Sequence, residues 1–350
     1  MVDGMTKDMI YGLICLEKEY CYVVFATLTN NGDIKEVISE FTWNLQRYIE
    51  ETGVRLLEEL CRKIRKNYPE YSKLEKIIIS MPGTIKENSV VISSSRIGIR
   101  KRIDASDFFK EELNVKTYIV HDMDCMVFGA FKDQLYTAEI MAKTLCYIIV
   151  DEGVGSTFLI EGKIHQGAGI AGHISRLVVE KRGTYMTELL ACGTLEAYVS
   201  RPAISKRCIE KYIASLDKKK KSEKSSSDQF RRSMEAISLK DPQGLTCDTI
   251  NIGVSENDDI AKTVVKEAAE YLGQAINSII TIMHPHEIIL SGSIITKIDE
   301  FYEQVIAEAE QLSWPSAWNY VTFNKSLDSR TDQLNGAALL ATYDNISEII

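Results

Sequence analysis

The sequence lacks the long apolar runs that cross a membrane. No stretch approaches the roughly 20 consecutive apolar residues that a membrane-spanning helix requires. The first residues, MVDGMTKDM, also lack the basic region and apolar stretch of a secretory signal peptide. Together these absences predict a cytoplasmic protein with no membrane partner.

Positive charge is scarce relative to negative charge. The chain has 41 Lys and Arg residues against 50 Asp and Glu residues, for a formal net charge of −9. Since nucleic acids and anionic membranes attract proteins through a large positive field, this balance argues against both as partners. One basic segment, the Lys- and Ser-rich residues 217–228, is predicted to be a disordered, solvated insertion because it is low in complexity and charged. Contact of that tract with nucleic acid is the alternative, which the acidic balance disfavours.

Paired cysteine motifs are absent as well. The eight cysteines are scattered along the chain without a Cys-x-x-Cys pair. Several of them, such as Cys21 and Cys146, lie inside apolar runs, and these are interpreted as small core residues. This use of cysteine fits a reducing cytoplasm.

What is present is a repeated pattern of short apolar runs. At 350 residues the chain exceeds the usual size of one domain, so two lobes are expected. Runs at residues 9–16, 20–28 and 34–38 are separated by polar turns, which is typical of an antiparallel meander. Runs at 145–150 and 158–160 open the second half in a similar way. The repetition predicts a duplicated α/β lobe.

Two turns at predicted strand ends are rich in glycine. They are the segments 153–155 and 291–293, which contain Gly153, Gly155 and Gly292. Without a Cβ, backbone amides can approach a phosphate closely, so these glycines are weak candidates for a cofactor-binding role. A simple hairpin turn is the alternative for each.

The order of the motifs carries more information than any one of them. A strand meander precedes Ser-Met-Pro-Gly at 80–83, and a later strand ends in His121-Asp122. The second meander is followed by a Gly-x-x-x-x-Gly-His-Ile segment at 167–174 and by Gly-Thr-Leu-Glu-Ala-Tyr at 193–198. This series resembles the ROK family of bacterial sugar kinases and sugar-responsive repressors, over about residues 9–345 apart from the insertion.

The resemblance implies a two-lobed actin-like ATPase fold of the ribonuclease H-like α/β class, with duplicated lobes and a central cleft. We expect an N-terminal lobe at residues 1–121 and a C-terminal lobe at residues 122–350. The final helix, residues 336–350, is expected to pack back on the N-terminal lobe. The family also implies a homodimer.

The resemblance transfers candidate site residues one position at a time. Asp122 stands where the family kinases place the aspartate that accepts the proton of the attacking sugar hydroxyl, so it is the candidate general base. Glu196 matches a glutamate that binds sugar hydroxyls. His121, His173 and Arg96 complete the predicted sugar-binding set. An ordinary polar residue at the end of an element is the alternative for Asp122 and Glu196.

Several of these positions are more cationic than the family pattern. His173 replaces a carboxylate, His121 replaces an asparagine, and Arg96 lies near another asparagine position, with Arg176 close by in sequence to His173. Guanidinium groups suit carboxylates and phosphates, so the ligand is predicted to be an acidic or phosphorylated sugar. The alternative is that some of these cations pair with Asp124 or Glu196.

The phosphate-binding turns of the family kinases are altered here. The Asp-x-Gly-Gly-Thr of the first hairpin corresponds to residues 14–18, which lack both glycines and the aspartate. The second turn carries Asp151 and Glu152 ahead of Gly153. At ~4 Å and a surface-like dielectric, a carboxylate repels a phosphate charge by about 4 kcal/mol. We therefore expect no Mg-ATP cofactor.

The family zinc site is expected to be missing. The positions of its one histidine and three cysteines correspond here to Arg176, Thr187, Leu189 and Thr194. None of these side chains is a good zinc ligand. The prediction is a chain without structural zinc.

Three functions remain open from the sequence. The first is a non-catalytic sensor or regulator that binds a carbohydrate, and the second is an ATP-dependent carbohydrate kinase with Asp122 as its base. The third is a structural pseudoenzyme without a ligand. The family repressors carry a winged helix-turn-helix before the first hairpin, where this sequence has only residues 1–8. Direct DNA binding is therefore not expected.

Overall fold

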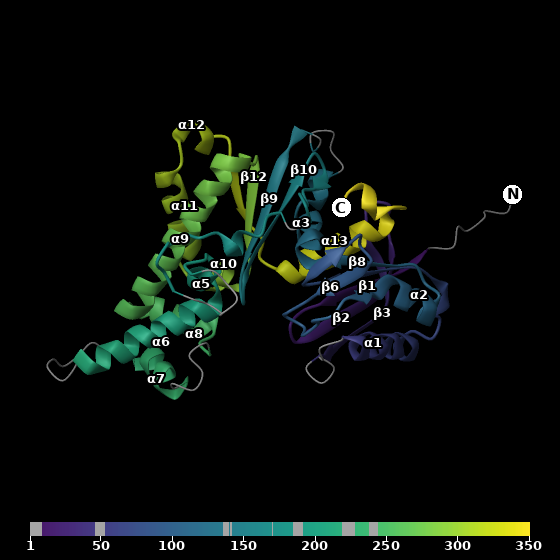
Figure 1. Cartoon of the computed structure of the whole chain (residues 1–350), viewed down its shortest axis with the longest axis horizontal. Helices are drawn as coiled ribbons and strands as arrows, with labels where there is room; N and C mark the ends of the chain where they lie inside the picture. Colours follow the sequence, from purple (N-terminus) through teal and green to yellow (C-terminus); the bar gives the residue numbers. More distant parts are fainter. Residues whose placement is uncertain are drawn as a thin grey trace. The chain divides into compact units, whose positions relative to one another are not determined.

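The chain forms two compact α/β units, each with its own five-stranded sheet (Figure 1). The computed structural model describes residues 9–45, 53–135, 140, 142–169, 171–184, 192–218, 228–237 and 244–350. The first unit comprises Met1–Ala142, Leu159–Ala171 and Ser329–Ile350, and the second comprises Lys143–Phe158 and Gly172–Asp328.

The sheet of the first unit has the strand order β3-β2-β1-β4-β8. Strands β1 (Ile10–Leu16), β2 (Tyr20–Leu28) and β3 (Ile34–Asn44) form the predicted antiparallel meander. Strands β4 (Leu74–Met81) and β8 (Thr117–His121) run parallel to β1. Parallel strands need a crossover, which α1 (Val54–Asn67) and α2 (Ala105–Leu113) supply. A small sheet of β5 (Thr84–Lys86), β6 (Val90–Ser93) and β7 (Ile103–Asp104) lies between β4 and α2 in sequence.

Strand β3 is longer than its apolar run indicated. Most of its residues are exposed, Val37 and Ile38 among them, and polar residues are frequent after Ile38, so the hydrophobic pattern fades there. Phe41 and Trp43 still face the core and stack on each other, with ring centroids 6.2 Å apart. These two aromatic side chains extend the strand to Asn44.

The core of the first unit lies between its sheet and the helices α1 and α2. Helix α1 buries Leu56, Leu57, Leu60, Cys61 and Ile64 at helical spacing, so one face of the helix meets the sheet. Complete burial of an aliphatic side chain contributes about 1.5–3 kcal/mol. This packing fixes the sheet whose strand ends carry the candidate site.

The sheet of the second unit has the order β11-β10-β9-β12-β13. Its strands are β9 (Thr144–Val150), β10 (Val154–Ile160), β11 (Lys163–Ile164), β12 (Glu287–Ser291) and β13 (Thr322–Lys325). Strand β11 and the last two residues of β10 fall in the segment Leu159–Ala171, which is counted with the first unit. As in the first sheet, three consecutive strands lie side by side and two later strands extend the sheet in parallel with the first of them. The two sheets therefore repeat one topology, which confirms the predicted duplication.

Helices make up most of the rest of the second unit. They are α5 (Glu196–Val199), α6 (Arg201–Lys218), α7 (Asp228–Ile237), α8 (Cys247–Ser255), α9 (Asp259–Met283), α10 (Ser293–Lys297), α11 (Phe301–Leu312) and α12 (Pro315–Trp318). The insertion predicted at 217–228 falls mostly on residues 219–227, which lie outside the described residues.

The units divide the chain differently from the predicted boundary between residues 121 and 122. Helix α3 (Asp122–Ala130), α4 (Lys132–Leu135) and the C-terminal helix α13 (Ser329–Thr342) all belong to the first unit. A Cβ on Gly336 of α13 would lie 1.7 Å from the carbonyl oxygen of Cys125 in α3. The two backbones are thus in direct contact, which joins α3 to the first unit. Helix α13 also begins and ends earlier than the predicted 336–350.

The close approach of α13 to α3 at Gly336 predicts how a substitution there changes stability. Gly336→Ala places a methyl group against the backbone of α3, so we expect the free energy of unfolding to fall by about 2–3 kcal/mol in chemical denaturation. The control is Asn335→Ala on the same helix, which removes atoms and adds none. Equal stability of the two variants would contradict the close approach of α3 and α13.

Candidate functional site

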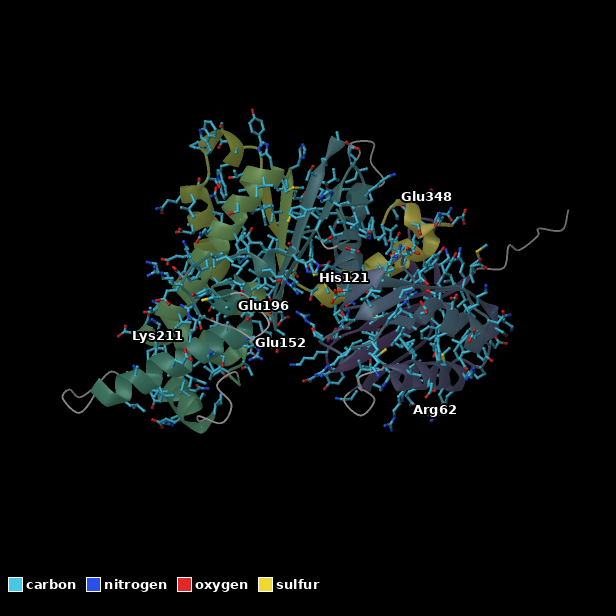
Figure 2. The ribbon with its side chains drawn as sticks, in the orientation of Figure 1. Arg62, His121, Glu152, Glu196, Lys211 and Glu348 are labelled. Carbon is cyan, nitrogen blue, oxygen red and sulfur yellow. The ribbon has the colours of Figure 1, made fainter. Side chains whose placement is uncertain are left out.

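In the first unit, the candidate site begins where β8 ends and α3 starts. His121 is the last residue of β8 and Asp122 the first of α3 (Figure 2). The Met123 amide donates to Nδ1 of His121 at 3.3 Å and to Oδ1 of Asp122 at 2.9 Å. The same Nδ1 lies 3.4 Å from Oδ1 of Asp122. Both side chains therefore help to begin α3 while facing the carboxyl end of the sheet.

The same edge of the sheet holds the turn that carries Arg96. Met81 at the end of β4 lies opposite His121 in the parallel register. After β4, the hydroxyl of Ser94 donates to the carbonyl of Pro82 at 2.5 Å and ties the turn at residues 95–98 to this edge. Carboxyl ends of parallel strands are where open α/β sheets bind ligands. The structure thus places Arg96, His121 and Asp122 on segments that follow the carboxyl ends of β4 and β8. That they share one ligand stays a prediction.

The guanidinium groups of Arg96 and Arg176 are exposed. Neither of them forms a hydrogen bond or ion pair with another side chain in the part of the chain that the structure describes. Among the described residues of each unit, Arg96 does not pair with Asp124 and Arg176 does not pair with Glu196, while the alternative stays open for His121 and His173. Each arginine remains able to bind an anion.

The first hairpin turn has a carboxylate where the family kinases have glycine. Glu17 follows β1, and its two carboxylate oxygens accept from Nε and a terminal nitrogen of Arg330 in α13 at 2.7 and 3.0 Å. The pair is largely exposed, so its own contribution to stability is small. The turn is nevertheless occupied by an anion of the chain.

In the second unit, the turn between β9 and β10 carries Asp151 and Glu152. The hydroxyl of Ser293 donates to Asp151 Oδ1 at 2.6 Å. Arg201, the first residue of α6, donates to both carboxylate oxygens of Glu152 through Nε and a terminal nitrogen, the latter at 2.9 Å. The hydrogen bond with Glu152 raises the pKa of the Arg201 guanidinium. The acidic turn is therefore held by two other segments of the same unit.

Glu196 also contacts this turn. Glu196 is the first residue of α5 (Figure 2). Its Oε2 accepts a hydrogen bond from the Val154 amide at 3.3 Å. Gly153 lies in the turn itself, whereas Gly155 is part of β10. Glu196 is thus positioned by the β9–β10 turn.

Gly292 allows β12 to end close to β9. Its φ of 99° is in the left-handed region, and a Cβ there would lie 2.3 Å from the carbonyl oxygen of Val150. Any other residue at this position would push the turn before α10 away from the end of β9. The glycine is required for this local packing, whatever the turn binds.

His173 and Arg176 lie on a short exposed segment of the second unit. His173 precedes the 3₁₀ turn Ile174–Arg176, and Arg176 is its last residue. The hydroxyl of Ser156 in β10 donates to the carbonyl of Gly172, just before His173. The described contacts within this unit do not join His173 to Glu196 directly. Their shared role in sugar binding stays a prediction.

Comparison with known proteins decides the family. The model of the ROK family matches residues 40–343. The chain belongs to the ROK family. The actin-like α/β fold that the sequence resemblance implied is confirmed by solved ROK structures.

The relatives of this ROK protein include kinases and a regulator. The chain is 21% identical over 333 residues to a glucokinase of Halalkalibacterium halodurans, covering 93% of this chain and 94% of that protein. It is similar to a ROK transcriptional regulator described as a homologue of the E. coli MLC protein, with a TM-score of 0.75, 16% identity and coverage of 96% and 78%. It is also similar to a Streptomyces griseus ROK glucokinase solved with glucose and AMPPNP, with a TM-score of 0.70, 13% identity and coverage of 94% and 98%.

The structure describes two of the four positions that correspond to the family zinc site. Thr187 and Leu189 lie outside the described residues, while Arg176 is exposed and Thr194 is buried.

Within the described residues, no helix is long and apolar enough to cross a membrane.

Sequence reasoning missed Arg201 and Arg330. Both bind glutamates that lie 49 and 313 residues away in the chain. No local sequence pattern predicts such an ion pair, because each arginine lies at the start of a helix, where a polar residue is common. The acidic residues of the turns were the available signal, since a half-buried carboxylate needs a partner.

Proposed function

We propose that this ROK protein binds a sugar or sugar derivative as a sensor and does not transfer phosphate. Its carbohydrate site lies at the edge of the first sheet where β4 and β8 end. Asp122 supplies a carboxylate that can accept a hydroxyl hydrogen, and His121 supplies an imidazole beside it. Both are group types that bind sugar hydroxyls.

The proposal that the protein does not transfer phosphate rests on the side chains in the two hairpin turns, β1–β2 and β9–β10. Glu17 and the Asp151-Glu152 pair stand where phosphate would approach, and their carboxylates are already bound within the chain. Arg201 offsets the charge of Glu152, but Asp151 receives its hydrogen bonds from the neutral Ser293. A phosphate brought to about 4 Å from Asp151 would be repelled by about 4 kcal/mol at an effective dielectric constant of 20. Tight binding of a polyphosphate is unfavourable in such a turn.

The ligand proposed here is an acidic or phosphorylated sugar. Arg96 offers an exposed guanidinium at the same sheet edge as Asp122, and it forms no side-chain pair in the described structure. A planar guanidinium binds a carboxylate or phosphate through two parallel hydrogen bonds. A neutral hexose would leave this group without an equivalent partner.

A binding screen tests this proposal. Neutral hexoses, hexose phosphates and sugar acids would each be titrated against the full chain by calorimetry. We expect saturable binding of at least one anionic sugar and weaker binding of its neutral parent. Preference for the neutral sugar would remove the anionic ligand, and absence of any sugar binding would remove the sensor function.

A carbohydrate kinase is the second candidate, favoured by Asp122 at the strand end that positions a general base. The same sugar panel with Mg-ATP measures nucleotide consumption. Turnover that Asp122→Asn abolishes would establish the kinase, whereas sugar binding without turnover supports the sensor. The predicted cytoplasmic location, the homodimer and the lack of direct DNA binding stay predictions beside either function.

A further inference from the structure

Two loops of the second unit meet at the carboxyl edge of its parallel strands. Strands β9 and β12 are parallel neighbours, with Ile149 opposite Ser291, so the β9–β10 turn and the start of α10 lie side by side. The close contact of Gly292 with the carbonyl of Val150 holds them together. This is the edge at which open α/β sheets bind anionic ligands.

The groups that could bind an oxyanion at this edge are already bound by carboxylates of the chain. They are a guanidinium, a hydroxyl and a backbone amide, supplied by Arg201, Ser293 and Val154. Their partners are Glu152, Asp151 and Glu196, in that order. Three anions of the protein thus occupy three donors of the kinds that hold phosphate.

The guanidinium of Arg201 is fixed in place for this contact. Its side chain is only 18% exposed, and one terminal nitrogen donates to the carbonyl of Leu245 at 2.7 Å. The remaining nitrogens bind both oxygens of Glu152 side by side. A guanidinium held in this manner can bind a phosphate or sulfate as well as a carboxylate, because all three anions present two oxygens at a spacing that matches two parallel N–H donors.

The first unit repeats the device in a weaker form. Glu17 lies in the β1–β2 turn, which corresponds in sheet topology to the β9–β10 turn, and Arg330 binds both of its oxygens. The side chains of Glu17 and Arg330 are 36% and 58% exposed, so water weakens this pair. Two equivalent turns therefore each contain a glutamate held by an arginine from a distant helix.

We propose that Glu152, assisted by Asp151, is a built-in substitute for a bound oxyanion. It attaches α6 to the β9–β10 turn through Arg201, so this edge is held together without a ligand. Removal of the Glu152 carboxylate leaves the guanidinium of Arg201, still held by the carbonyl of Leu245, to bind a small oxyanion in its place. Asp151 remains bound to Ser293 and repels this oxyanion, so inorganic phosphate is expected to bind only at millimolar concentration, in keeping with the poor binding of a polyphosphate. This inference deepens the proposed function, because it explains how the altered turn is stabilised in a protein that does not use nucleotide.

The test is chemical rescue of Glu152→Ala by inorganic phosphate, with sulfate as a second anion. In chloride buffer we expect the thermal unfolding midpoint of the full chain to fall by about 2–6 °C, since a partly buried guanidinium loses its partner. Millimolar phosphate should restore at least half of that loss and leave the wild-type midpoint almost unchanged. Calorimetry should show phosphate binding to Glu152→Ala that the wild type lacks.

Glu267→Ala is the matched control. It removes the carboxylate that pairs with Arg207, whose side chain is 13% exposed, and with Lys211 at 3.2 Å, at a position of similar burial outside the turn. We expect a lower midpoint that phosphate restores less than it does in Glu152→Ala, because Arg207 keeps its contacts with the carbonyl and the ring of Tyr198.

Three results would overturn the inference. They are that phosphate fails to restore Glu152→Ala, that it restores Glu267→Ala to the same extent, or that it shifts the wild-type midpoint equally. Each of these results identifies an ordinary ion pair. If Glu152→Ala does not fold in chloride, it is expected to fold when refolded in phosphate, and failure in both buffers contradicts the substitute role. The rescue experiment contains no sugar. Its failure would therefore not contradict the proposed sugar binding, which the binding screen tests separately.

Discussion

Arg96→Ala is expected to weaken the binding of an anionic sugar by about 10- to 100-fold. A charge-assisted hydrogen bond contributes roughly 1.5–3 kcal/mol, and each 1.4 kcal/mol is about tenfold in affinity. The side chain is exposed on a turn that Ser94 ties to the sheet edge, so its loss should not disturb the fold. Calorimetric titration of wild type and variant with the same sugar phosphate or sugar acid gives the ratio.

Two comparisons make this expectation specific. Lys101→Ala removes another exposed cation from the same segment of the chain and should change the affinity by less than about threefold. The neutral parent sugar should bind wild type and Arg96→Ala alike. An unchanged affinity for the anionic sugar in Arg96→Ala would show that this arginine does not contact the ligand.

Asp258→Ala is expected to lower the free energy of unfolding by about 3–5 kcal/mol, because it leaves the partly buried guanidinium of Arg231 without its carboxylate and removes the cap of α9. Asp258 has a fully buried side chain and lies just before α9. Its carboxylate accepts from Arg231 in α7 at 2.9 Å and from the amides of Ile260 and Ala261 at 2.9 and 3.2 Å. One side chain therefore begins the longest described helix of the second unit and attaches α7 to it.

Chemical denaturation of the second unit measures the effect of this change. The control is Asp248→Ala, which breaks an exposed pair with Lys297 and should cost less than about 1 kcal/mol. A loss at Asp258 as small as that at Asp248 would contradict the structural role of the buried pair.

The fold was largely predictable because its signals are local. The runs at 9–16 and 20–28 match β1 and β2 almost residue for residue, since a short polar turn separates them and another follows the second. The topological repeat in the second half followed from the same pattern. The unit boundary was not predictable in this way, because it depends on the contact between Gly336 and α3, which are more than two hundred residues apart.

The candidate site was predictable only at strand ends. The apolar strand that ends in His121 and Asp122 located the two residues, and the resemblance to the ROK family gave them their predicted roles; the structure places them where β8 ends and α3 begins. The guanidinium partners of the acidic turns could not be named. Arg201 and Arg330 reach those turns through the tertiary fold, and a single sequence contains no record of such pairings.

Titration of the wild-type protein with Mg-ATP, in the presence and absence of a bound sugar, tests the central claim most directly. With Asp151 and Glu152 filling the β9–β10 turn, we expect sugar binding to be measurable and no saturable nucleotide binding in the micromolar range. Micromolar Mg-ATP affinity would contradict the claim, because it would require the nucleotide to displace both carboxylates from their partners.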